Sequence, residues 1–331
     1  MQGIERRSAA ECHKRHTIAR NERAHGLHES NSGKSQRIHP MAHTSHDKDV
    51  YFVPEPSYWP IIGSIGLFLL VGGVSVGLNG IGGGYHAALI GLAIFIVMLF
   101  GWFGAVIREN LADVYNAQVD RTFRWAMAWF IFSEVMFFAA FFGALFYARV
   151  LAIQWLSGAG GESLTQLLLW PNFEATWPTN GPEAIGGKFG IVSAWGLPAI
   201  NTAILLTSSW TVTLAHHALR AGHQARTSLW LAVTVALGVA FLVLQAKEYV
   251  HAYEHLNLTL ESGIYGSTFY MLTGFHGAHV TLGTIMLTVM LFRSLKGHFR
   301  PERHFAFEAT AWYWHFVDVV WLGLFIFVYI L

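Results

Sequence analysis

Seven long apolar segments, separated by short polar ones, constrain this 331-residue chain more than any other feature of its sequence. Each segment holds about 20 residues or more, enough to cross a hydrocarbon core of about 30 Å as a helix. Only 12% of the residues are charged, whereas about a quarter are charged in a soluble chain. The pattern predicts an all-α membrane protein with seven transmembrane helices at 61–79, 84–107, 123–148, 195–219, 227–250, 267–292 and 305–331.

The distribution of lysine and arginine predicts how these helices are oriented. Nine of these residues lie in the segments 107–124, 220–226 and 293–304. Only three lie on the opposite side, and they are Arg149, Lys188 and Lys247. Because cytoplasmic loops carry the excess of positive charge, we expect the N-terminus in the cytoplasm (or matrix) and the C-terminus outside. An odd number of spans agrees with this orientation.

Charge and cysteine content exclude several classes of protein. The formal net charge is +1, which gives no indication of nucleic-acid binding. Cys12 is the only cysteine, so the chain has no internal disulfide and no cluster held by cysteines. The first apolar segment begins at Ile61, so we expect no secretory signal peptide and an uncleaved first span.

The N-terminal region differs in kind from the rest. Residues 1–40 hold eight Lys or Arg, four Glu and five His, with few large apolar side chains, so we predict a disordered tail over 1–47. A histidine-rich metal-binding tail and a transit peptide are alternatives, but translation that starts at Met41 is the simplest explanation. The seven-span domain is expected over 48–331, with an external loop at 151–193 that contains one short helix.

Glu134 lies about 15 Å deep in the third predicted span, near the membrane midplane. Burying a charged group at that depth costs free energy, so we expect the carboxyl group to have a structural or functional role. It either makes a hydrogen bond between helices or takes part in proton handling, and the residue pattern leaves both open. A proton-coupled transporter would also suit a midplane carboxyl group, but the chain shows neither an inverted repeat nor a pair of broken helices.

Histidines and carboxylates in the later spans are candidates for a buried polar network. His276 and His279 are three residues apart, which is a metal-like spacing, but further ligands are missing and we expect hydrogen-bonded histidines and no metal site. Glu308, His315 and Asp318 share one face of the last helix, which must look at the bundle or at another chain. His216 and His217 of "AHHAL" point about 100° apart around the helix. We expect them to cap the helix end or to lie at the membrane interface.

Six motifs then identify a family. In order they are "YFVPEPSYWPIIGS" (51–64), "FSEVMFFAAFF" (132–142), "AHHAL" (215–219), "QAKEY" (245–249), "GSTFYMLTGFHGAHV" (266–280) and "FEATAWYWHFVDVVWL" (307–322). The sequence from about 48 to 331 resembles cytochrome c oxidase subunit III, of the haem-copper oxidase superfamily. A subunit III of a quinol oxidase is the alternative, although such relatives often have five spans.

The resemblance implies a fold in which helices one and two form one bundle, helices three to seven form another, and a V-shaped cleft between them holds phospholipid. It implies a non-catalytic core subunit of a proton-translocating oxidase that supports assembly, proton uptake and the stability of subunit I. Haem and copper would lie in the partner subunits I and II, with no redox centre, catalytic residue or metal in this chain, and cytochrome c would be met only through the complex.

The resemblance also implies roles for single residues. Glu134 matches the buried carboxylate of the family's third helix, and phospholipid headgroup ligands are expected at Arg293, Arg220 and His217. We expect a multi-pass protein of the bacterial plasma (inner) membrane, with its C-terminus in the periplasm.

Overall fold

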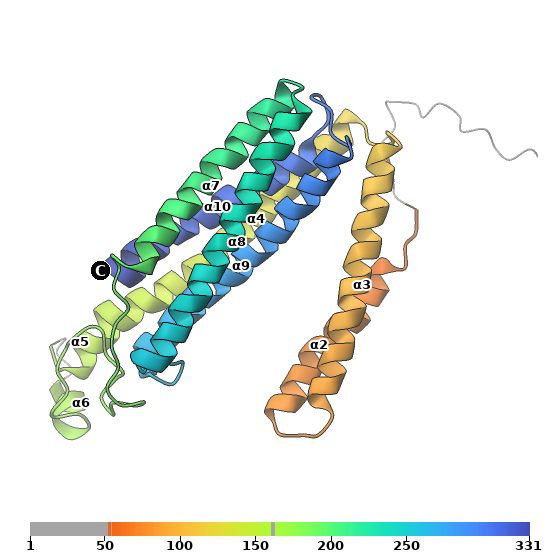
Figure 1. Ribbon diagram of the computed structural model, residues 1–331. Helices are drawn as coiled ribbons and strands as arrows, with labels where there is room; N and C mark the ends of the chain where they lie inside the picture. The colour runs from red at the N-terminus through yellow and green to blue at the C-terminus, as the bar shows by residue number, and fades with distance from the viewer. Residues whose placement is uncertain (1–51, 54, 160–162) are drawn as a thin grey trace, which may run out of the picture. The chain divides into compact units, whose positions relative to one another are not determined.

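The computed structural model describes residues 52–53, 55–159 and 163–331, so the predicted tail over 1–47 lies outside the described residues (Figure 1). Contacts within the chain make one unit of Lys48–Leu331. All regular secondary structure of the described part is helical, apart from one isolated bridge between Arg300 and Arg303. The predicted all-α class is confirmed.

Seven helices of the described residues are long and apolar enough to cross a membrane, as predicted. Three short elements add to them: a π-helical turn (Tyr147–Ala152) and α5 (Ile153–Leu156) continue the third span, and a second π-helical turn (Phe325–Ile330) continues the last. The main helices of the seven spans are, in order, α2 (Trp59–Leu78), α3 (Gly84–Leu111), α4 (Ala117–Phe146), α7 (Leu197–Arg220), α8 (Gln224–His255), α9 (Gly263–Leu295) and α10 (Phe305–Leu324).

Several helices extend past the predicted bounds. The third span continues as helix to Leu156, so the predicted start of the external loop at residue 151 is wrong by about one and a half turns. Similarly, α8 runs from Gln224 to His255 where 227–250 was predicted. The reason is that hydropathy marks where lipid ends, whereas a helix continues through polar residues of good helix propensity until a glycine or a turn stops it. The short helix expected in the loop is α6 (Ser163–Leu168).

Helices α2 and α3 pack on each other through glycines, and Figure 1 shows them side by side. A Cβ atom at Gly73 would lie 2.4 Å from the Ala88 backbone nitrogen, and one at Gly91 would lie 2.3 Å from that of Leu70. Such distances are far below ordinary contact, so only glycine permits this approach. Small residues at the contact are how membrane helices maximise van der Waals packing where lipid provides no hydrophobic drive.

The other five spans pack together, with α10 in contact with α4, α7 and α9, and with α8 in contact with α7 and α9. Trp314 is the centre of this packing: its side chain is fully buried and its indole N–H donates to Ser208 Oγ of α7 at 2.9 Å. On the other side, a Cβ at Gly283 of α9 would lie 2.8 Å from the Trp314 ring. Packing contacts therefore join α2 with α3, and α4 with α7 to α10, while the lipid-holding cleft stays a prediction.

Candidate functional site

Glu134 of α4 and His279 of α9 form a pair near the middle of the 40-residue third span. Glu134 Oε2 lies 3.0 Å from His279 Nε2, and the other ring nitrogen, Nδ1, lies 2.7 Å from the carbonyl oxygen of Phe275. A carbonyl oxygen only accepts, so Nδ1 carries a hydrogen. The contact between Nε2 and Oε2 then requires one more proton, which belongs either to the imidazole or to the carboxyl group.

Aromatic rings surround this pair. Phe138 lies 5.0 Å from the His279 ring, measured between centroids, and Phe137 lies 5.9 Å away. The pair is not sealed, because 22% of the Glu134 side chain remains accessible. Apolar surroundings make an unpaired polar group costly, so the contact between the two side chains satisfies both of them. The exposed side of Glu134 is available to groups outside this chain.

A second cluster lies at the predicted inner ends of α7 and α10. Glu308, in the first turn of α10, accepts from Arg124 Nη1 of α4 through Oε2. Its Oε1 lies 3.2 Å from His304 Nε2 and 3.7 Å from His216 Nε2, and these two nitrogens are 3.2 Å apart. Arg124 also donates through Nε to Asp120 at 2.8 Å. The cluster thus combines two imidazoles with a carboxylate that arginine holds in place.

The remaining predicted network residues make contacts of their own. His315 Nδ1 lies 2.6 Å from Ser209 Oγ of α7, and Asp318 Oδ2 lies 3.9 Å from the same nitrogen, beyond hydrogen-bond length. His276 is buried, with Nε2 3.2 Å from the carbonyl oxygen of Val317.

The single polar network expected for His276, His279, Glu308, His315 and Asp318 is therefore not what the structure shows. These residues join different partners at different depths. The ten residues from Glu308 to Asp318 correspond to about 15 Å along a helix axis, so a shared face does not bring the side chains together. Trp312 of the same helix does not cover these groups completely from outside, because 37% of its own surface is exposed.

The three lipid candidates are not placed together. Arg293 is buried, its Nη2 lies 3.3 Å from Asn110 Oδ1 of α3, and its guanidinium lies over the Phe299 ring at 4.8 Å. Arg220 and His217 are exposed at the end of α7. A headgroup role for these three residues stays a prediction.

Sequence reasoning missed a buried carboxyl group at the other end of the bundle. Glu248 of the "QAKEY" motif is only 1% exposed, and its Oε1 accepts from Tyr329 at 2.7 Å and from Gln245 Nε2 at 3.3 Å. Tyr329 lies 81 residues away along the chain, so no local pattern announces the pair. The contacts of Arg124 with Glu308 and of His304 with His216 were missed for the same reason, since these partners are 184 and 88 residues apart along the chain.

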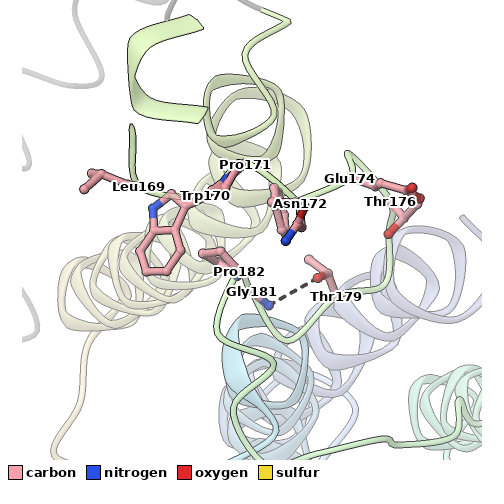
Figure 2. Close-up of a pocket in the computed structure, with 10 residues that line it drawn as sticks. Leu169, Trp170, Pro171, Asn172, Glu174, Thr176, Thr179, Gly181 and Pro182 are labelled. Carbon is pink, nitrogen blue, oxygen red and sulfur yellow. Dashed lines mark hydrogen bonds between the residues drawn. The ribbon is translucent and has the colours of Figure 1, made fainter. Parts of the chain in front are cut away.

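The external loop forms an open pocket of about 430 Å³ between Leu169 and Pro182, drawn in Figure 2. Glu174 is the only ionisable side chain among its lining residues, and the one hydrogen bond drawn there joins the Gly181 N–H to Thr179 Oγ1 at 3.2 Å. A lone carboxylate without a basic or nucleophilic partner does not make a catalytic site. The loop pocket therefore does not compete with the intramembrane pair as the functional site.

Comparisons with known proteins agree with the fold. The family model of cytochrome c oxidase subunit III matches residues 49–160 and 166–331. The chain is 41% identical to "Cytochrome c oxidase subunit 3" of Prototheca wickerhamii over 286 residues, which cover 85% of this chain and 97% of that one. It is 40% identical to the protein of the same name in Marchantia polymorpha (85% and 96% covered) and 36% identical to that of Cyprinus carpio (87% and 98% covered). The chain belongs to the cytochrome c oxidase subunit III family.

Proposed function

We propose that this chain is a non-catalytic core subunit of a respiratory cytochrome c oxidase and that it supports proton uptake by subunit I. The relatives are named for cytochrome c and not for quinol, which favours cytochrome c as the electron donor of the complex. In this proposal haem and copper belong to partner subunits I and II. The described residues contribute proton-binding groups and packing surfaces.

The pair of Glu134 and His279 is the observation that carries the proposal. One transferable proton lies between Glu134 Oε2 and His279 Nε2, which are 3.0 Å apart near the middle of the membrane. The carboxyl group is partly accessible from outside the chain. Burying such groups in a bilayer is costly, and the cost is accepted where protons or ions are handled. The pair is suited to buffer protons beside a neighbouring subunit, and it is not suited to reduce oxygen by itself.

The outer surface of α4 supports a role in assembly. Trp129, Phe132 and Met136 follow one another at spacings of three and four residues and are each at least half exposed. Such a stripe needs either lipid or the helix of another subunit against it. We expect the chain to co-purify with a haem-bearing subunit, and a chain that purified alone with bound haem would contradict the proposal.

The test replaces Glu134 with glutamine in the purified oxidase complex, reconstituted into vesicles. Oxygen reduction should begin at a normal rate, while the proton-to-electron ratio falls or the enzyme inactivates after fewer turnovers. Glu254→Gln is the matched control, because it neutralises an exposed glutamate near the C-terminal end of α8. Unchanged pumping, assembly and lifetime in Glu134→Gln would show that the carboxyl group only packs.

We also place the N-terminus on the cytoplasmic (or matrix) side, and the membrane as the plasma (inner) membrane of a bacterium. The excess of lysine and arginine in the loops on that side supports the orientation. Cys12→Ser removes the only cysteine, so His223→Cys and Glu254→Cys can then be labelled one at a time. A membrane-impermeant thiol reagent applied from outside should label Glu254→Cys and spare His223→Cys, and the reverse result would invert the orientation.

A further inference from the structure

We propose that His216, His304 and Glu308 form a binding site for one divalent transition-metal ion of the zinc class. The three side chains come from the end of α7 and from the beginning of α10. Each offers one ligand atom, and these atoms all lie within 4.8 Å of one another. The sequence predicted no metal site in this chain, and His216 lies 88 residues before His304, so no local spacing brings the three ligands together.

The distances match a tetrahedral ion. Ligands bound to zinc at 2.0–2.1 Å and separated by the tetrahedral angle lie about 3.3–3.4 Å apart. The nitrogens of the two histidines are 3.2 Å apart, and Glu308 Oε1 is 3.2 Å from His304 and 3.7 Å from His216. An ion therefore fits with small adjustments of side chains. Three protein ligands leave the fourth position for water, as in open zinc sites.

The surroundings hold the ligands in position. Arg124 occupies Glu308 Oε2, which leaves Oε1 directed at the histidines. The His216 ring stacks on Phe307 at a centroid distance of 5.6 Å and an angle of 29°. Partners of this kind, which orient a ligand without touching the metal, are typical of built metal sites. Accessibility is sufficient for entry, since 27% of the His216 side chain is exposed.

The donor set selects the class of ion. Two imidazoles and one carboxylate suit Zn²⁺ and its transition-metal neighbours, whereas Ca²⁺ and Mg²⁺ prefer oxygen ligands only. The positive charge of Arg124 is shared between Asp120 and Glu308, so it opposes the ion less than a free arginine would. Arg220 is close enough to act on His216 and does oppose the ion. A bound ion would join the inner ends of α7 and α10 and fix the position of Glu308.

The test measures zinc in the intact oxidase complex after a chelator wash and equilibration with zinc chloride. Bound zinc is counted per haem by elemental analysis, and its ligands are read from the X-ray absorption edge. The native complex should hold one more zinc ion than complexes with His216→Gln or His304→Gln. His304→Cys keeps a zinc ligand and should restore the ion, which separates loss of the site from poor assembly.

The control removes histidines elsewhere. His86→Gln combined with His223→Gln deletes two exposed imidazoles outside the cluster, and this complex should keep the ion. The five histidines of residues 1–40 are unchanged in every variant and cannot produce a difference. Equal zinc content in all variants, or an absorption spectrum without imidazole ligands, would show adventitious binding and overturn the proposal.

Discussion

Replacing Gly73 with alanine should force α2 and α3 apart, whereas the same change at the adjacent Gly72 should not. A Cβ at Gly73 would lie 2.4 Å from the Ala88 nitrogen and 2.8 Å from the Gly84 carbonyl oxygen, inside the 3.4 Å at which ordinary contact begins. Backbone atoms cannot rotate away as a side chain can, so the helices must separate by about an ångström. A Cβ at Gly72 meets nothing within 4 Å.

The pair of variants isolates the cost of this separation. Both changes gain the same helix propensity, about 1 kcal/mol when glycine becomes alanine inside a helix, and this gain cancels in the comparison. Overpacking a close contact costs about 1–3 kcal/mol, so the free energy of unfolding of Gly73→Ala should be lower than that of Gly72→Ala by this amount. Gly72→Ala itself should be as stable as the native chain or slightly more so.

The assay is reversible unfolding of the full chain in mixed micelles with increasing dodecyl sulfate, followed by tryptophan fluorescence. Amide hydrogen exchange of α2 and α3 then shows whether the loss is local, since the α4 and α7–α10 amides should exchange as in the native chain. Equal unfolding midpoints for Gly72→Ala and Gly73→Ala would refute the reasoning. Faster exchange in α7–α10 alone would refute it as well.

Three further changes test other contacts. Trp314→Phe loses the indole hydrogen bond to α7 and leaves a gap, and should lower the unfolding free energy by about 1–3 kcal/mol, whereas Trp312→Phe, which is exposed, should stay within about 0.5 kcal/mol in the same titration. Tyr329→Phe removes a hydrogen-bond donor from the buried Glu248 and should lower the free energy of unfolding by about 1–3 kcal/mol in thermal unfolding. Adding Glu248→Gln should recover part of this loss, and no recovery would contradict the assignment. Burial, together with the hydrogen bond to a glutamate of α3, raises the pKa of the Tyr115 phenol, so its contribution to stability is full below about pH 10, the ordinary value for tyrosine, and is lost as the pH rises beyond it. Ultraviolet titration of Tyr115→Phe should show one late-ionising tyrosine fewer than the native chain, and an unchanged curve would contradict this.

The sequence by itself determined the number of spans and their approximate bounds. Hydropathy is a local property, and a long apolar segment has few alternatives to a helix in lipid because its backbone must satisfy its own hydrogen bonds. Predicted helix ends were less accurate, as at Leu156 and His255, because helices continue into water. The six motifs between residues 51 and 322 were enough to recognise the family that the comparisons then showed.

Only the tertiary structure decided which polar groups meet. Glu134 and His279 are 145 residues apart, and His216 and His304 are 88 residues apart, so no spacing within one helix reveals either pair. Helical periodicity predicts that Glu308, His315 and Asp318 share one face but says nothing about the neighbours across that face. Those neighbours depend on how α4, α7, α9 and α10 pack, and packing is settled by close contacts such as Trp314 against Gly283, which arise only when all the helices are assembled.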